Sequence, residues 1–152
     1  MPCRSATATL TSLNHQGGLK TPLLLLGLQM INFGDNATVV ALIPSNTITT
    51  TTTGSAVDLV DYDGEAAVIL NCSAGGAGAT CNVKLTHSDT SGGTYTDVTD
   101  AAFTQVGNTA SLQKISVNTN EIKQFVKAVC TVAGTASFKI GVELVAVKKY
   151  LP

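Results

Sequence analysis

The stretch LTHSDTSGGTYTDV places a histidine, a serine and an aspartate side by side at His87, Ser88 and Asp89. These are the residue types of a hydrolase triad, in which the histidine takes the serine proton and the aspartate orients the histidine. A triad needs side chains that converge, and its members normally come from distant parts of the chain. Neighbouring strand residues point to opposite faces, so Ser88 is expected to point away from the other two. The pattern therefore predicts a turn, with Gly92 and Gly93 permitting positive φ, and we expect no enzyme.

Two of the four cysteines, Cys72 and Cys81, face each other if their strands form a hairpin. Such a pair has two chemical interpretations, a cross-strand disulfide or a shared metal ion. Zinc takes four ligands, usually from closely spaced pairs, and here only His87 offers a third ligand. A reducing cytoplasm keeps thiols free. We therefore expect no metal and no cofactor, and we interpret the cysteines as small apolar residues, with the disulfide as the open alternative.

An acidic cluster lies in the stretch VDLVDYDGE, where the portion DYDG matches the first half of a calcium-binding loop. The cluster consists of Asp58, Asp61, Asp63 and Glu65. A complete calcium loop also needs a further ligand position before the glycine and a glutamate several residues beyond it, where this chain has apolar residues. The stretch therefore predicts a polar turn that leads into a strand.

The elements that would position these residues are β-strands. The stretches EAAVILNC and TCNVKLTH flank a glycine-rich turn, SAGGAGA, and apolar residues alternate with polar ones. The alternation predicts a hairpin in which three pairs of side chains share one sheet face. The predicted pairs are Val68 with Leu85, Leu70 with Val83, and Cys72 with Cys81.

A second hairpin is predicted near the end of the sequence, from QFVKAVCTV and ASFKIGVELVAVKK. Every other residue of the latter strand is apolar, which predicts one buried face. That face consists of Phe138, Ile140, Val142, Leu144 and Ala146. Short strands are also expected in YTDVT, AFTQV and LQKISV, and no long stretch has a convincing helical period. The predicted fold class is all-β, a β-sandwich or jelly roll of about eight strands with an extended N-terminal arm.

Residues 1–55 contain fewer strand patterns than residues 56–152 and include a low-complexity threonine run. We therefore predict an N-terminal arm with a threonine-rich connector over residues 1–55 and a β-sandwich domain over residues 56–152. The arm contains an apolar run, Leu23–Ile31, that is about half the ~20 residues a membrane-spanning helix needs. Two roles for this run stay open, a buried strand of the sandwich or an anchor that docks on a neighbouring subunit. The anchor is favoured because the arm has few other apolar residues. The candidate inter-subunit contacts are Leu23, Leu24, Leu25, Leu26, Leu28, Met30 and Ile31.

The composition points towards assembly. Charged residues make up 12% of the chain, about half the usual share of a soluble domain, and the formal net charge is -1. A weakly charged surface suits a subunit that is packed among others. The few Lys and Arg residues form no basic stripe, so we expect no direct nucleic-acid partner and no membrane association. Aromatic residues are 5% of the chain and Trp is absent, which disfavours sugar binding by ring stacking.

Three stretches carry a resemblance to a known family: VDYDGEAAVIL, VKLTHSDTSGGTYTDVTDAAFTQV and EIKQFVKAVCTVAGTASFKIGVELVAVKKY. Their pattern of strands and turns resembles small structural proteins of tailed bacteriophages, in particular head decoration or cement proteins. The resemblance covers the chain from about Ala56 to Tyr150 and contains no catalytic signature.

The resemblance implies a virion structural protein that is made in the host cytoplasm and sits on the outer surface of an icosahedral capsid. It implies the major capsid protein as a partner, and self-association as a homo-oligomer, often a homotrimer. An alternative from a different class stays open, namely a receptor- or glycan-binding β-sandwich module of a tail or fibre.

Overall fold

The computed structural model describes residues 37–149, and the structural statements below concern this part of the chain. It consists of nine β-strands joined by turns and loops. The strands are β1 (Ala37–Ile48), β2 (Thr52–Thr53), β3 (Val57–Asp58), β4 (Glu65–Cys72), β5 (Thr80–Ser88), β6 (Thr96–Ala102), β7 (Ser111–Asn118), β8 (Phe125–Ala133) and β9 (Phe138–Val147). Within this range there is no helix with the length and apolar character needed to cross a membrane.

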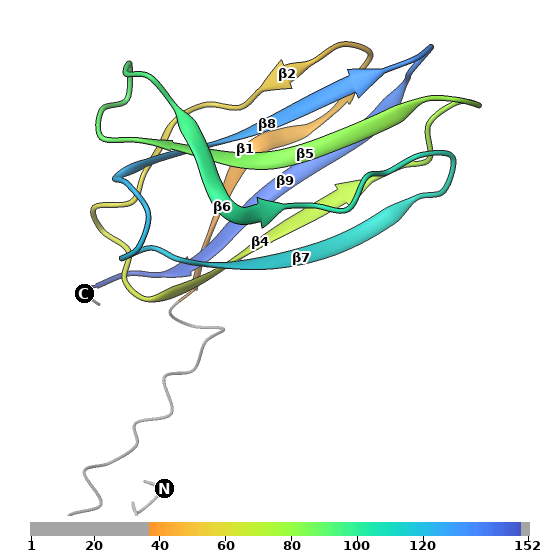
Figure 1. Cartoon of the computed structure of the whole chain (residues 1–152). Coiled ribbons are helices and arrows are strands. Elements are labelled where there is room, and N and C mark those ends of the chain that lie inside the picture. Colours follow the sequence, from red (N-terminus) through yellow and green to blue (C-terminus); the bar gives the residue numbers. More distant parts are fainter. Residues whose placement is uncertain (1–36, 150–152) are drawn as a thin grey trace, which may run out of the picture. The chain divides into compact units, whose positions relative to one another are not determined.

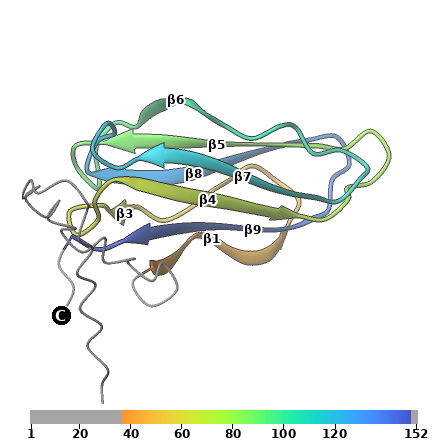
Figure 2. The ribbon, with the colours of Figure 1, turned by 90° about the horizontal axis from the view of Figure 1, so that it is seen from below.

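The strands form two antiparallel sheets that pack face to face (Figure 1). Sheet A has four strands in the order β1-β9-β4-β7. Sheet B has the order β2-β8-β5-β6, and the short β3 also pairs with β8. In the view from below, β5 lies towards one side of the molecule and β9 with β1 towards the other (Figure 2). The predicted all-β sandwich is confirmed.

The strand order is that of a jelly roll. With the short β3 set aside, the first strand pairs with the last and the second with the second last, and so on inwards. The resulting pairs are β1 with β9, β2 with β8, β4 with β7, and β5 with β6. This is one long antiparallel ribbon rolled into two sheets, so most consecutive strands of the chain lie in opposite sheets.

Both predicted hairpins are wrong in their pairing. β4 pairs with β7 and β9 in sheet A, whereas β5 pairs with β6 and β8 in sheet B. The glycine-rich segment 73–79 therefore carries the chain across the sandwich instead of around a hairpin. In the same way, β8 lies in sheet B and β9 in sheet A. Alternation shows which side chains face the core, but it cannot distinguish a partner within the sheet from one across the core.

The core lies between the inner faces of the two sheets, where the alternation predicts it. The first predicted face is buried throughout, at Val68, Leu70, Cys72, Cys81, Val83 and Leu85. The second is buried as well, at Phe138, Ile140, Val142, Leu144 and Ala146. On the opposite face of β9, Lys139 is exposed and Glu143 is half-buried, as the period of two requires.

The predicted domain boundary between residues 55 and 56 is wrong for the described part of the arm. β1 pairs with β9 in sheet A and β2 pairs with β8 in sheet B, so residues 37–53 belong to the sandwich. The threonine-rich segment joins these two strands and crosses from one sheet to the other. It is a connector, as predicted, but one inside the domain. Its β-branched residues lack the alternation that marks a core-facing strand.

β1 contains a bulge that turns consecutive residues towards the core. Its register against β9 shifts between Ala41 and Ile43, and again between Ile43 and Asn46. Leu42 and Ile43 are only 0% and 1% exposed, which a regular strand does not permit for neighbours. Gly54 packs against this bulge, and a Cβ there would overlap the Leu42 carbonyl oxygen. The approach of the two backbones therefore requires glycine at this position.

Candidate functional site

His87, Ser88 and Asp89 do not form a triad. The Ser88 hydroxyl accepts the backbone N–H of Thr90 at 3.4 Å, in the turn where β5 ends. His87 Nδ1 accepts the backbone N–H of Lys123 at 3.2 Å. The Asp89 carboxylate forms an ion pair with Lys123 Nζ at 2.8 Å. The histidine and the serine thus have separate partners, and the prediction of a turn is confirmed.

The glycines of this turn provide space and not, as predicted, positive φ. Neither Gly92 nor Gly93 has a positive φ. A Cβ on Gly93 would lie 2.7 Å from Ser88 Oγ, so only glycine lets the turn close over the serine. Positive φ is found instead at Gly78 and Gly134, in the connections that cross between the sheets.

In the acidic stretch 58–65, the carboxylates of Asp58 and Asp63 bind other parts of the protein. Asp58 Oδ1 accepts the backbone N–H of Val60 at 2.9 Å and the Gln124 side-chain amide at 3.0 Å. Asp63 accepts the Asn120 side-chain amide at 2.9 Å. Among residues 37–149, no group of three or more His, Cys, Asp or Glu side chains is arranged to hold a metal ion. The described contacts of Asp58 and Asp63 are those of a polar turn.

The predicted cross-strand pairing of Cys72 with Cys81 is wrong, because the two residues lie in different sheets, although their thiols interact across the core. The sulfur of Cys81 is instead 3.0 Å from that of Cys130 on β8. All three are free thiols in the core. Burial raises the pKa of Cys72 to about 12. The hydrogen bond with Cys130 raises the pKa of Cys81, and burial raises it further.

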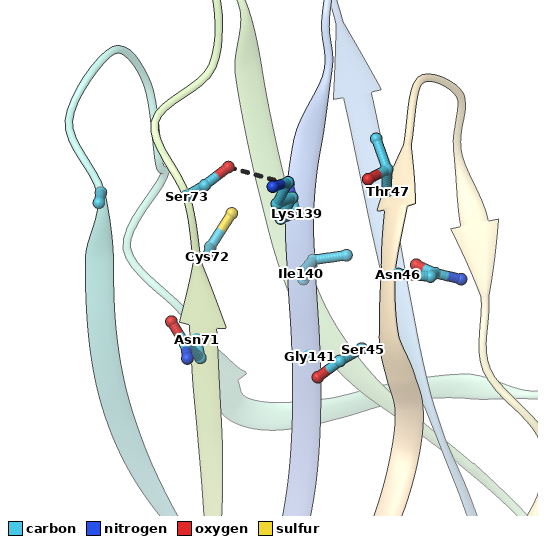
Figure 3. Close-up of a pocket in the computed structure, with 10 residues that line it drawn as sticks. Ser45, Asn46, Thr47, Asn71, Cys72, Ser73, Lys139, Ile140 and Gly141 are labelled. Atoms are coloured by element: carbon cyan, nitrogen blue, oxygen red, sulfur yellow. Dashed lines mark hydrogen bonds between the residues drawn. The ribbon is translucent and has the colours of Figure 1, made fainter.

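An open pocket of about 390 Å³ lies at one end of sheet A (Figure 3). Residues of β1, β4 and β9 line most of it, and half of all the lining residues are serine, threonine or asparagine. Ser73, in the loop after β4, accepts the backbone N–H of Lys139 through its Oγ at 2.9 Å. Gly141 leaves room for Ser45, since a Cβ at residue 141 would lie 2.6 Å from Ser45 Oγ. Tight packing between β1 and β9 therefore shapes this pocket.

The pocket contains hydroxyl groups, and no base among the described residues is hydrogen-bonded to them. Its lining residues include no His, Asp or Glu. Glu143 Oε1 lies near the same Gly141 position as Ser45 Oγ, without a hydrogen bond between the two side chains. Lys139 is the cationic residue of the lining. The lining also has no aromatic ring on which a sugar would stack. The arrangement suits polar contacts with a partner and does not support nucleophilic catalysis.

The outer face of sheet A carries apolar side chains among charged and polar ones. The charged and polar residues of this face are Glu65, Asn71, Lys114, Ser116, Asn118, Lys139 and Glu143. The register aligns Val39, Val145 and Ala67 in one row across β1, β9 and β4. Val39 and Leu112, on the two edge strands of the sheet, are 64% and 75% exposed. We use the name outer apolar face for Ala37, Val39, Ala67, Ile69, Leu112, Val145 and Val147. Large apolar side chains that are as exposed as Val39 and Leu112 are typical of a contact with another macromolecule.

The two edges of sheet A differ. At the β7 edge, Gln113 Oε1 accepts the backbone N–H of Thr104 at 2.8 Å, and its amide donates to the Thr104 carbonyl at 2.9 Å. The Gln113 side chain thus acts as a bridge to the segment that follows β6. At the other edge, β9 is the only partner of β1 among residues 37–149. An edge strand presents backbone groups to which a further strand can bind.

The predicted inter-subunit contacts, Leu23 to Leu28 with Met30 and Ile31, lie outside the described residues and stay a prediction. The outer apolar face was missed because alternation assigns its residues to solvent. Val145 and Val147 also look like ordinary strand formers. The sequence of β1 did contain a signal for this face: the alternate residues Ala37, Val39 and Ala41, which lie on the outer side of the strand, are all uncharged and apolar.

No protein-family model matches this chain. No curated protein matches it either. Among solved structures, the chain is similar to the SPBc2 prophage-derived protein YomS, with 15% sequence identity and a TM-score of 0.45. That alignment covers 74% of this chain and 93% of the prophage protein.

Two structures from infectious bursal disease virus are also similar. The alignment to a chain of the Gt strain has 16% identity and a TM-score of 0.49, and it covers 75% of this chain and 34% of that one. The alignment to the VP2 subviral particle has 14% identity and a TM-score of 0.46, and it covers 74% and 32%. The chain thus spans about a third of each of these viral chains. The assignment of the jelly roll rests on the strand pairing itself.

Proposed function

We propose that the protein is a virion structural protein that decorates an icosahedral phage capsid and stabilises it by bridging neighbouring major capsid subunits. The observation that carries this proposal is the outer apolar face of sheet A, with Val39 and Leu112 64% and 75% exposed on opposite edge strands. Covering such a surface with a partner is favourable by about 25 cal/mol per Å² of apolar area. The surface therefore suits a subunit that works in an assembly.

Three further features support the proposal. The chain is only 12% charged, so charge repulsion opposes close packing of subunits weakly. The jelly roll is a common fold of viral capsid domains, although lectin domains use it too, so the fold weighs less than the surface. The sequence resemblance to decoration proteins points to the same role.

In this role the sandwich packs in a homo-oligomer on the outer surface of the capsid, and the run Leu23–Ile31 anchors the arm on a neighbouring subunit. A protein that binds only the assembled capsid stabilises that state by mass action. Bridging adds to this, because a protein held at two sites dissociates only when both contacts open.

A second candidate is a receptor- or glycan-binding module of a tail or fibre. The polar pocket at the end of sheet A favours it, because Asn46, Asn71 and Lys139 offer hydrogen bonds to sugar hydroxyls. The lack of an aromatic ring in the lining places this candidate second.

The test compares phage particles with and without the protein. Particles that carry it are expected to survive a higher temperature and a stronger osmotic shock, and the purified protein is expected to bind empty capsids. Equal survival together with no capsid binding would contradict the proposal. Binding of the isolated protein to a glycan array or to host cells, without capsid binding, would establish the second candidate.

A further inference from the structure

Three buried cysteines converge in the core without a role in the proposed function. Cys72 ends β4 in sheet A, and Cys81 and Cys130 lie on β5 and β8 of sheet B. Their exposures are 1%, 0% and 0%. Small apolar residues would fill these positions equally well, so the presence of thiol groups raises the question of their chemistry.

The pair Cys81 and Cys130 has geometry close to that of a bond. The two sulfurs are 3.0 Å apart, whereas a disulfide is about 2.05 Å long. Cys81 lies opposite Val132 and Cys130 opposite Val83, so the cysteines are diagonal neighbours on paired strands. Diagonal Cα atoms are about 7–8 Å apart, slightly beyond the usual range for a disulfide. Because the side chains already point towards each other, a small movement of the strands would be enough to form the bond.

We propose that Cys81 and Cys130 are a redox-sensitive pair, which hydrogen peroxide converts into an intramolecular disulfide that joins β5 to β8. The pair lies between two hydrogen-bonded strands in the middle of sheet B. The bond would therefore fasten one sheet of the sandwich from within. This inference is independent of the virion role, and either can fail without the other.

The oxidation proceeds in two balanced steps. The Cys130 sulfur attacks one oxygen of hydrogen peroxide, the O–O bond breaks, and a sulfenic acid and one water form. The Cys81 sulfur then attacks the sulfenic sulfur, the S–S bond forms, and a second water leaves with the thiol proton. Two thiols and one peroxide thus give one disulfide and two waters, and the peroxide takes up both electrons. A small oxidant is required because neither sulfur is exposed.

The surroundings favour one order of reaction for the two sulfurs. A hydrogen bond from Cys81 lowers the pKa of Cys130, and a thiolate is the form that attacks an oxidant. The proposed sequence of steps has Cys130 react first and Cys81 resolve the sulfenic acid; the 3.0 Å separation of the two sulfurs serves either order. Cys72 lies in the opposite sheet, and burial raises its pKa to about 12, but its thiol also interacts with that of Cys81. The peptide map therefore has to distinguish a bond from Cys81 to Cys130 from a bond from Cys81 to Cys72.

The test uses the full-length reduced protein, treated with hydrogen peroxide and then denatured for thiol counting. The count is expected to fall from four thiols to two, since the sequence has four cysteines. Peptide mapping should find the fragment with Cys81 linked to the fragment with Cys130. The bond closes a chain separation of 49 residues, so the Tm of the oxidised protein should rise by about 10 °C.

Variants separate this pair from the other thiols. Cys72→Ala should still form the bond, whereas Cys130→Ala should keep all its remaining thiols and show no rise in Tm. If the Cys130 variant fails to fold, the peptide map of the wild-type protein decides. Four thiols after treatment, a link that involves Cys3 or Cys72, or a link between two chains would overturn the proposal.

Discussion

The two sheets share one core but present different outer faces. On sheet B the polar side chains are paired locally. Lys84 Nζ forms an ion pair with Asp97 at 2.7 Å, and Lys127 Nζ lies 4.0 Å from the centre of the Tyr95 ring. On sheet A the outer apolar face is exposed on both edge strands. The outer face of sheet B is adapted to contact with water. Covering the outer apolar face of sheet A with a partner would instead lower the free energy.

The largest effects are expected where the two sheets are alike, on their inner faces. Phe138→Ala in sheet A should lower the free energy of unfolding by about 3–5 kcal/mol, and Leu85→Ala in sheet B by about 2–5 kcal/mol, because both side chains are fully buried. Val39→Ala on the outer apolar face should change it by less than about 0.5 kcal/mol. Urea denaturation measures all three. A cost for Val39 as large as that for Leu85 would show that the outer face stabilises the isolated domain.

The next effect concerns the end of sheet A that forms the pocket. Gly141→Ala would bring a Cβ within 2.6 Å of Ser45 Oγ and 2.9 Å of Glu143 Oε1, and overpacking of this kind costs about 1–3 kcal/mol. Gly92→Ala is the matched control, because a Cβ there meets nothing within 4 Å and its φ is not positive. Thermal denaturation of both variants tests this. Equal Tm values would mean that β1 and β9 are less closely packed than the structure shows.

A smaller effect is expected at the Gln113 bridge between β7 and the segment that follows β6. Gln113→Ala removes two hydrogen bonds to the backbone of Thr104 and should cost about 1–2 kcal/mol. Gln113→Glu keeps an acceptor for the Thr104 N–H but loses the donor, so its cost should be intermediate. Denaturant unfolding ranks the three proteins. A neutral Gln113→Ala would show that the bridge adds nothing to the stability of the sandwich.

The smallest effect is expected on the polar face of sheet B. Lys84→Ala removes an ion pair whose side chains are 44% and 62% exposed, so the loss should be about 0.5 kcal/mol and should vanish in 1 M salt. Unfolding at low and high salt measures this. A loss above 2 kcal/mol, or one that persists in high salt, would contradict the interpretation of sheet B as a face adapted to water.

The sequence predicted the burial of strand residues far better than their partners. Val68 and Leu85 were correctly placed in the core, yet they lie in different sheets and not on paired strands. A period of two specifies a face and leaves the neighbour open. Which strands share a sheet depends on the jelly-roll pairing, in which β1 pairs with β9 from the opposite end of the described chain. Such long-range pairing has no local signature.

In the candidate site, too, local features could be predicted from the sequence and long-range ones could not. The turn at Ser88 was predictable, because the reach of adjacent side chains can be judged from the strand geometry alone. The meeting of Cys81 with Cys130 and the outer apolar face were not predictable, because each depends on strands that are distant in sequence. The face was identifiable only after the register had placed Val39 beside Val145 and Ala67.

The central claim is that sheet A, and not sheet B, contacts the capsid. Val39→Glu on the outer apolar face and Thr131→Glu on the outer face of sheet B are matched, because each adds one charge at an exposed strand position. The direct measurement is the affinity of each variant for empty capsids, with circular dichroism to confirm folding. We predict that Val39→Glu weakens binding by more than about tenfold, equivalent to 1.4 kcal/mol, while Thr131→Glu binds like the wild type. Undiminished binding of Val39→Glu, or a loss confined to Thr131→Glu, would contradict the account.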